Sequence, residues 1–279
     1  MLNLPDFLPL VKAGLHIIAT PIGNRGDITL RALDVLQKAD LIYCEDTRTS
    51  RPLLETFSIK APLKSLHEHN ETALIPEIIN RIEAGEKLAL ISDAGMPLIS
   101  DPGYKLVKAL QDQNLPVTVI PGASAVVTAA ALSGLPTDRF MFCGFVDTKK
   151  LTDFQGIDAS LIFYESPHRL LKTLQAMVPV FTQRTIAVLR ELTKLHEEVV
   201  RGTIVEVLEA FSKRDKILGE IVLVLSPPLK IGPTLSPQDI DIALIDAMKS
   251  HSLKDACTLV AGTLGLPRKD IYKRALALK

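Results

Sequence analysis

Short apolar runs alternate with amphipathic segments along roughly the first half of this 279-residue chain. Four such runs lie at 15–20, 41–44, 88–91 and 117–120. Apolar runs of this length are typical of strands buried on both faces of a parallel sheet. The segments between them repeat apolar residues at helical spacing, as Leu30, Leu33 and Leu36 do. Strands that alternate with helices in this way predict βαβ units around a parallel sheet.

Polar and proline residues suggest where several helices begin or change direction. Asp27 is placed to cap the helix that follows the first strand. Pro102 suits the first position of a later helix, with Ser100 or Asp101 as its cap. Another helix contains Pro76, so we expect that helix to kink or restart there.

Three of the predicted strands end in loops with more glycine, proline or carboxylate than a simple connection needs. These loops follow Thr20, Ile91 and Ile120, and the second of them reads SDAGMP. Because the carboxyl ends of parallel strands lie at one edge of a sheet, the three loops can share one ligand pocket. The alternative is that each loop only turns the chain, with Asp93 and Ser124 as turn or helix caps.

The pattern changes after Phe145. Residues 146–158 are polar with little periodicity, and we interpret them as a linker. Further on, residues 185–200 form either one long strand or two strands around Thr193, and residues 217–225 form an interrupted apolar strand. This part of the chain therefore predicts a second, smaller α/β domain.

Residues 226–228 read SPP and break the pattern again, and the rest of the chain predicts three short helices. Ser252 and Asp255 have the spacing of a capping box at the start of the second helix. The sequence thus divides into an N-terminal α/β domain at 1–145, a second α/β domain at 146–228 and a C-terminal helical segment at 229–279.

Charge narrows the possible partners. The formal net charge is zero, so no overall positive field attracts nucleic acid, and any such contact has to come from local patches. One patch is the segment from Lys249 to Lys279, which has seven basic and two acidic residues. It is either a contact to phosphates or a solvated helical face.

Several classes of protein are disfavoured by what the sequence lacks. No apolar run approaches membrane-spanning length, and the N-terminus does not read as a signal peptide. The three cysteines are far apart, which argues against a disulfide framework or a zinc site and favours a reducing compartment. We therefore expect a cytoplasmic protein without membrane contact or metal. The common nucleotide-loop, metalloprotease and esterase motifs are missing as well.

The loops nevertheless carry an ordered set of motifs. They read ATPIGNRGDIT, EDTR, HEHNE, SDAGMPLISDPGY, PGASA, SGLP, FYESPHRL and RELTK, and they span about residues 15 to 225. In this order they resemble the ribosomal RNA small subunit methyltransferase I family, which belongs to the tetrapyrrole (precorrin) methylase superfamily. The basic C-terminal tail also resembles the helical piece of that family.

The resemblance implies a fold and a reaction. It implies two α/β domains of the tetrapyrrole methylase type with S-adenosylmethionine (AdoMet) in the cleft between them, plus a small C-terminal helical segment. It implies a homodimer that methylates the ribose 2′-hydroxyl of one cytidine in the decoding region of small-subunit (16S) ribosomal RNA. Two alternatives remain: a tetrapyrrole C-methyltransferase of the precorrin type, and a non-catalytic module that binds AdoMet or RNA.

Carried over by position, the resemblance also implies cofactor contacts. These residues are Pro21, Ile22, Asp93, Gly95, Met96, Ser124, Ala125, Tyr164 and Glu191. Chemistry supports part of this assignment, because Asp93 can meet the AdoMet ammonium or a ribose hydroxyl, and backbone amides near Gly95 can meet the carboxylate. Met96 and Arg25 depart from the family pattern, which usually has Thr and Leu there, so Met96 brings no hydroxyl to the cofactor loop.

Catalysis and RNA binding suggest further residues. A ribose hydroxyl is weakly acidic, so a general base should assist the transfer by about 100-fold or more. Asp46, His67, His69 and Lys194 are the candidates, although either histidine is also explained as a surface polar residue. Contacts to RNA are expected from Arg25, Arg48 and Arg169, together with His168 and the basic C-terminal helices.

Overall fold

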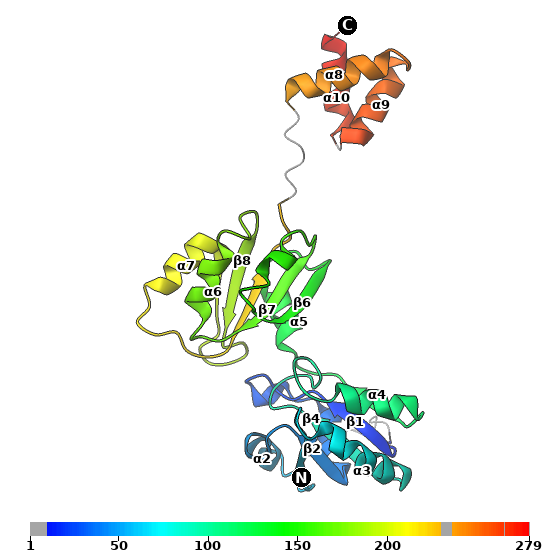
Figure 1. Cartoon of the computed structure of the whole chain (residues 1–279), viewed down its shortest axis with the longest axis vertical. Helices are drawn as coiled ribbons and strands as arrows, with labels where there is room; N and C mark the ends of the chain where they lie inside the picture. Colours follow the sequence, from blue (N-terminus) through cyan, green and yellow to red (C-terminus); the bar gives the residue numbers. More distant parts are fainter. Residues whose placement is uncertain (1–9, 230–235, 265, 279) are drawn as a thin grey trace. The chain divides into compact units, whose positions relative to one another are not determined.

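A computed structural model describes residues 10–229, 236–264 and 266–278 of the chain. Residues 1–228 form one unit, whose described part is built on two five-stranded sheets, and residues 229–279 form a second unit of helices (Figure 1). This arrangement confirms the predicted fold class, an α/β protein with two sheets and a C-terminal helical segment.

The first sheet is entirely parallel, with the strand order β3-β2-β4-β1-β5. Its strands are β1 (Gly14–Ile18), β2 (Leu41–Cys44), β3 (Leu63–Ser65), β4 (Lys87–Ile91) and β5 (Val117–Ile120). Its helices are α1 (Leu30–Lys38), α2 (Thr47–Thr56), α3 (Glu71–Glu83) and α4 (Tyr104–Asp112). Residues of α1 and α2 belong to one core cluster of this sheet, and residues of α3 and α4 belong to the other. Burial on both faces explains why the central strands read as continuous apolar runs.

The helix starts differ from those that the sequence suggested. Asp27 ends a short 3-10 turn, and the cap of α1 is Thr29, whose hydroxyl accepts a hydrogen bond from the Ala32 amide at 3.1 Å. Pro102 is not the first residue of a helix, because α4 begins after Gly103, which has φ of 126°. Such a backbone angle is outside the helical region, so neither Ser100 nor Asp101 can act as the cap.

Of the two outcomes expected at Pro76, a kink or a restart, the restart is wrong, because α3 continues through this residue. A proline inside a helix removes one backbone donor and crowds the preceding turn. The packing of Ile78 and Ile82, both buried against the first sheet, stabilises the helix beyond the proline.

The second sheet is mixed, with the strand order β6-β7-β10-β8-β9. Its strands are β6 (Phe140–Phe145), β7 (Ser160–Glu165), β8 (Thr185–Arg190), β9 (Glu198–Thr203) and β10 (Ile221–Leu225). Only β6 and β7 pair in parallel, and the other neighbours are antiparallel. Residues of α6 (Leu170–Met177) and α7 (Ile204–Ser212) join one core cluster of the sheet, and those of α5 (Ala125–Ser133) join the other.

The structure tests two expectations about the strands of the second sheet. Residues 185–200 contain two strands, β8 and the first half of β9, joined by a turn at 191–197. The strand expected at 217–225 is shorter and covers only Ile221–Leu225.

The chain passes from the first sheet to the second earlier than the sequence suggested. β6 pairs with β7, and α5 packs against β8 and β10, so both belong to the second lobe although they precede residue 146. The expected linker at 146–158 contains a 3-10 turn at Leu151–Phe154, and Leu151 is buried in the core of the second lobe. We therefore propose that the boundary between the lobes lies between β5 and α5.

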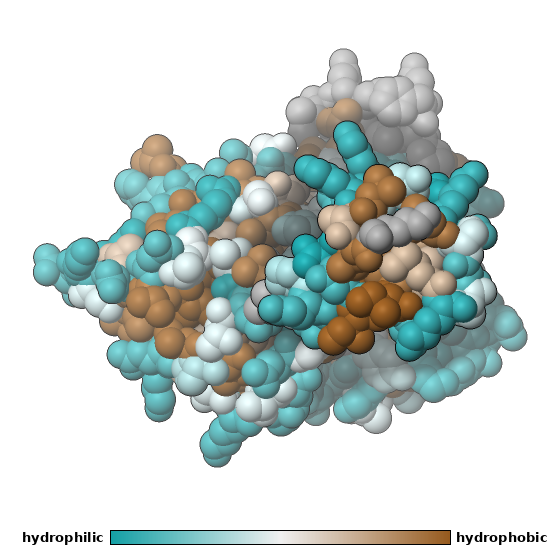
Figure 2. Space-filling view, turned by 90° about the horizontal axis from the view of Figure 1, so that it is seen from above, coloured by the Kyte–Doolittle hydropathy of each residue, from teal (hydrophilic) through white to brown (hydrophobic). Residues whose placement is uncertain are grey.

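The C-terminal unit consists of three helices in its described residues, as predicted. They are α8 (Pro237–Met248), α9 (Leu253–Leu264) and α10 (Arg268–Ala277). Ser252 accepts a hydrogen bond from the Asp255 amide at 3.3 Å, as the capping-box spacing predicted. In Figure 2, the part of the molecule nearest the viewer has apolar side chains (brown) gathered among polar ones (teal) at its surface. None of the helices in the described ranges is long and apolar enough to cross a membrane.

Arg184 connects separate segments of the second lobe by hydrogen bonds, and its contribution to stability can be tested. It is buried just before β8, and its guanidinium donates to the carbonyl oxygens of Ala159 at 2.9 Å and Ser226 at 2.7 Å. We expect Arg184→Ala to lower the free energy of unfolding by about 3 kcal/mol, because several buried carbonyls lose their donor. Urea unfolding of the full chain, followed by circular dichroism, measures this loss.

The matched control for this prediction is Arg139→Ala, which removes an exposed arginine whose ion pair with Asp158 spans 3.4 Å. An exposed pair contributes about 0–1 kcal/mol, so the control should unfold nearly as the parent protein does. Equal effects of the two substitutions would contradict the anchoring role of Arg184.

Candidate functional site

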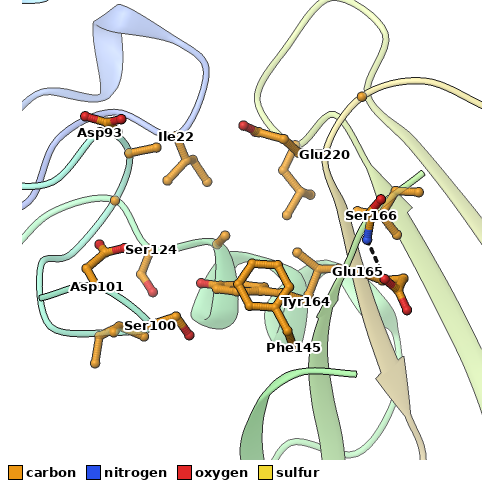
Figure 3. Close-up of a pocket in the computed structure, with 18 of the residues that line it drawn as sticks. Ile22, Asp93, Ser100, Asp101, Ser124, Phe145, Tyr164, Glu165, Ser166 and Glu220 are labelled. Carbon is orange, nitrogen blue, oxygen red and sulfur yellow. Dashed lines mark hydrogen bonds between the residues drawn. The ribbon is translucent and has the colours of Figure 1, made fainter. Parts of the chain in front are cut away.

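A cavity of about 420 Å³ lies between the loops of the first sheet and the strand ends of the second. The first lobe contributes Ile22 after β1 and residues 93–101 after β4 (Figure 3). The second lobe contributes the start of α5, the ends of β6 and β7, Leu192 and residues 219–222. The cavity therefore lies at the carboxyl edge of the parallel strands, where the sequence predicted a shared pocket.

Gly95 holds the loop after β4 against the end of β1. Its amide and carbonyl exchange hydrogen bonds with the carbonyl and amide of Thr20, at 3.1 and 2.8 Å. The φ angle of Gly95 is 81°, and a Cβ atom at this position would lie 3.3 Å from Ile22. Only glycine takes this backbone conformation without strain, so its position in the loop has a structural reason.

The N-terminus of α5 forms part of the same wall. Ser124 precedes the helix, and its hydroxyl makes no capping hydrogen bond. The first amides of a helix have no acceptor within the helix and attract negative groups. Because Ser124 and Ala125 both line the cavity, this helix end can meet an anionic part of a ligand.

The opposite wall is aromatic and apolar. The Tyr164 ring contacts Phe142 and Phe145 edge to face, with centroids 4.8 and 5.5 Å apart. Leu192 and Val222 complete this side. Burial raises the pKa of Tyr164 to about 12, so its hydroxyl stays neutral at physiological pH.

The charged groups of the wall are all acidic. Asp93, Asp101, Glu165 and Glu220 line the cavity, and among the described residues no Lys, Arg or His does. Burial raises the pKa of Asp93 and, more strongly, that of Asp101, which reaches about 6. These shifts mean that the negative charges lack compensation, which favours a ligand with positive charge.

Most of the predicted cofactor residues meet in this cavity. The seven that line it are Ile22, Asp93, Gly95, Met96, Ser124, Ala125 and Tyr164. Pro21 and Glu191 are not part of the wall. Glu191 lies behind it, where its Oε1 accepts hydrogen bonds from the Glu220 amide at 2.9 Å and from Lys194 at 2.8 Å.

The residues proposed as the general base do not line the cavity. Asp46 caps α2 and pairs with Arg48 at 2.6 Å, and hydrogen bonds from Arg48 lower its pKa to about 2. A carboxylate with so low a pKa is a poor proton acceptor. His67 and His69 lie in the turn before α3, with ring centroids 6.0 Å apart.

Lys194 is also unsuited to accept a proton. It forms ion pairs with Glu191 at 2.8 Å and Glu220 at 2.9 Å. Burial alone would lower its pKa, but the hydrogen bonds to the two carboxylates outweigh burial, and the pKa lies above its usual value. Lys194 therefore stays charged and orients Glu220, which does line the cavity.

The arginines proposed for RNA contact lie at the surface. Arg25 is exposed in the 3-10 turn after β1. Arg48 is exposed but paired with Asp46, and Arg169 is about half exposed and pairs with Glu165 at 2.7 Å. On α10, the basic residues Arg268, Lys269 and Lys273 are exposed.

Sequence reasoning missed several wall residues. The sequence suggests a helix cap for Asp101, the end of a domain at Phe145, and an interruption of the strand expected at 217–225 where Glu220 lies. One signal could have identified Asp101, because it lies in the same loop as Asp93 after a buried strand. Phe145 and Glu220 reach the cavity only through the pairing of the second sheet, which the sequence does not reveal.

Most of the chain is similar to known protein families and to named relatives. Residues 14–208 match the family model of the Tetrapyrrole (Corrin/Porphyrin) Methylases, and residues 234–279 match that of the RsmI C-terminal HTH domain. Proteins named "Ribosomal RNA small subunit methyltransferase I" are similar as well. The one from Mesorhizobium japonicum is 41% identical over 96% of this chain and 93% of its own, and the one from Thermotoga maritima is 44% identical over 76% and 97%.

Solved structures share the fold at low sequence identity. A uroporphyrin-III C-methyltransferase from Thermus thermophilus, complexed with S-adenosyl homocysteine, has a TM-score of 0.52 at 16% identity and covers 76% of this chain and 97% of its own. A diphthine synthase has a TM-score of 0.60 at 16% identity and covers 76% and 89%. At this identity the similarity establishes the fold of the α/β part.

Asp93 provides a direct test of the cavity as an AdoMet site. We expect Asp93→Asn to weaken AdoMet binding about tenfold, or about 1.4 kcal/mol, because an acidic wall residue loses its attraction for a cationic ligand. Isothermal titration calorimetry with AdoMet measures the affinity.

Asp46→Asn is the matched control, since the Asp46 side chain does not line the cavity, its contact with Asp93 is through the backbone amide at 3.3 Å, and asparagine can still cap α2. Its affinity for AdoMet should stay within about twofold of the parent protein's. An unchanged affinity in Asp93→Asn would remove Asp93 from the site.

Proposed function

Because this chain belongs to the ribosomal RNA small subunit methyltransferase I family, within the tetrapyrrole methylases, we propose that it methylates small-subunit ribosomal RNA with AdoMet as donor. The acceptor is the ribose 2′-hydroxyl of a cytidine in the decoding region of 16S RNA. The observation that supports the reaction most directly is the acidic cavity at the carboxyl edge of the first sheet.

The wall of the cavity fits the chemical groups of AdoMet. The ammonium and sulfonium are cationic and suit an acidic wall, and the carboxylate of Asp93 is the contact we propose for the ammonium. The carboxylate suits the amides at the start of α5, and the purine suits the apolar wall with Tyr164 and Leu192. Each part of the molecule thus has a matching group among the residues present.

Bound AdoMet supplies an activated methyl group whose leaving group is a neutral thioether. The residues of this chain have three tasks: they bind the donor, align the acceptor oxygen behind the methyl carbon, and exclude water. Alignment of two reactants in one site can supply several kcal/mol, with about 7–11 kcal/mol as an upper range. The close-packed apolar wall around Tyr164, Leu192 and Val222 serves the exclusion of water.

RNA has to approach an acidic cavity, so its phosphates need cations outside the wall. Arg25 and Arg48 in the first lobe, Arg169 in the second and the basic face of α10 supply them. With no net charge on the whole chain, a few local contacts carry this attraction. We propose that the substrate is the assembled small subunit, which adds shape to these contacts, rather than free RNA.

The assay for this function uses AdoMet with a labelled methyl group and small subunits that lack the modification. We expect label in the 16S RNA at one cytidine whose 3′ phosphodiester resists alkaline hydrolysis, because a 2′-O-methyl group blocks that cleavage. Free 16S RNA should be methylated more slowly. Label transferred to a porphyrinoid instead would favour the tetrapyrrole alternative, and no transfer to any acceptor would favour a non-catalytic module.

We also propose that the active protein is a cytoplasmic homodimer. β6 is an edge strand, and its Phe140 and Met141 are 45% and 41% exposed, which leaves an apolar strip without cover in the monomer. A second copy of the chain is the occupant we propose for this strip.

The dimer is tested with Met141→Lys, which places a charge in the strip. We expect this variant to shift from dimer to monomer in light scattering after size-exclusion chromatography. Leu30→Lys, at an apolar residue of α1 that is 46% exposed in the first lobe, is the control and should leave the mass unchanged. A monomeric parent protein would contradict the proposal.

A further inference from the structure

We propose that the carboxylate of Asp101 is the general base of the methyl transfer and takes the proton of the acceptor hydroxyl. This inference rests on the proposed function and adds a catalytic residue to it. None of the candidates that the sequence offered for this role lines the cavity.

Two of the four carboxylates in the wall are held by cations. Glu165 accepts a hydrogen bond from the Ser166 amide at 2.6 Å and pairs with Arg169 at 2.7 Å. Glu220 pairs with Lys194 at 2.9 Å. A carboxylate engaged by a cation is not free to contact an acceptor hydroxyl, so neither group is suited to the role.

Asp93 and Asp101 have no such ion pair, but they differ in their hydrogen-bond partners. Asp93 accepts a hydrogen bond from the Asp46 amide at 3.3 Å and another from the Thr49 hydroxyl. The hydrogen bond to Asp101 comes from the hydroxyl of Ser92. Asp101 is therefore the wall carboxylate with neither a cation nor a backbone amide as partner among the residues that the structure describes.

The backbone around Asp101 is held in an unusual conformation. Leu98 and Ser100 have φ angles of 72° and 69°, and Gly103 has 126°. Residues other than glycine rarely adopt such angles, and strain of this kind persists where the surrounding structure fixes it, often at functional sites. Figure 3 shows Asp101, Ser100 and Ser124 on the wall of the cavity that faces Tyr164.

The charges that face Asp101 all raise its proton affinity. Burial is the largest cause of its raised pKa, and the carboxylates of Glu45 and Asp93 add to it, while the Ser92 hydroxyl acts in the opposite direction. Tyr164 faces it from the second lobe and stays neutral. With a pKa of about 6, Asp101 is ionised at neutral pH and still basic enough to assist proton removal.

With Asp101 as the base, every bond, electron pair and proton of the methyl transfer is accounted for. The bond between the acceptor oxygen and the methyl carbon forms as the bond between that carbon and the sulfur breaks. The sulfur keeps the electron pair and becomes a neutral thioether. The hydroxyl proton moves to the carboxylate of Asp101, which releases it to solvent after the product leaves.

Asp101→Asn tests the proposal, because asparagine keeps the shape and cannot accept the proton. At saturating AdoMet and small subunits, we expect single-turnover methylation to fall about 100-fold. AdoMet affinity and melting temperature should stay close to those of the parent protein. The parent rate should rise tenfold per pH unit below the pKa of Asp101 and level off above it, with the inflection at or below about 6 because bound AdoMet is cationic, and the variant should lose this inflection.

A second measurement does not depend on activity. In protein labelled with ¹³C-aspartate, one carboxyl resonance should titrate near pH 6 and be absent from the Asp101→Asn spectrum. Asp112→Asn, an exposed change on α4, is the control and should alter neither rate nor pH profile.

Three results would overturn the assignment. They are a titration near pH 4, a parent rate without the inflection, and an Asp101→Asn variant that loses AdoMet affinity but keeps its rate at saturation. The last would make Asp101 a cofactor ligand. A parent protein without methyl transfer would instead refute the proposed function itself.

Discussion

Ile22 lines the cavity and packs against the second lobe, so it joins the two walls of the cavity. Ile22 follows a strand of the first sheet, yet it is buried in a cluster with Leu189 and Val222 of the second. Nearby, the Asn24 amide donates a hydrogen bond to the Thr193 hydroxyl at 3.1 Å, which adds a polar tie between the lobes. Because protein interiors are close-packed, a shift at this contact would move both walls of the cavity together.

The sequence predicted the first lobe better than the second for a physical reason. Strands buried on both faces of a parallel sheet are recorded directly in apolar runs such as 41–44 and 88–91, and their loops fall at one edge. The second sheet depends on pairings between distant segments, such as β7 with β10, that leave no local mark. The same limit explains which site residues the sequence predicted. Asp93 was predicted because it follows a buried strand. Glu220 was missed because it reaches the cavity only through the pairing of β10.

The carboxylates of the cavity wall would repel the phosphates of an RNA substrate. The distribution of charge over the protein reduces this repulsion. The carboxylates that attract a cationic donor would repel phosphates, so donor and RNA need separate surfaces. In the first lobe, Arg25 and Arg48 are exposed outside the wall, and the ion pair with Arg48 keeps Asp46 ionised but compensated. Lys194 compensates Glu191 and Glu220 in the same way from the second lobe. Among the described wall residues, negative charge without a cationic partner is thereby concentrated on Asp93, which is proposed to meet the donor, and on Asp101, the proposed base.

We propose that the C-terminal helices contribute to RNA binding rather than to the chemistry. The relative from Thermotoga maritima is matched over 97% of its own length by 76% of this chain, so about a quarter of this chain has no counterpart there. The solved methyltransferase with S-adenosyl homocysteine is likewise covered over 97% by 76% of this chain. The fold of the tetrapyrrole methylases therefore needs no more than a part of the size of the α/β unit. The C-terminal unit has its own core around Leu244 and Ile271, and we propose that the exposed basic residues of α10 contribute to affinity for the RNA.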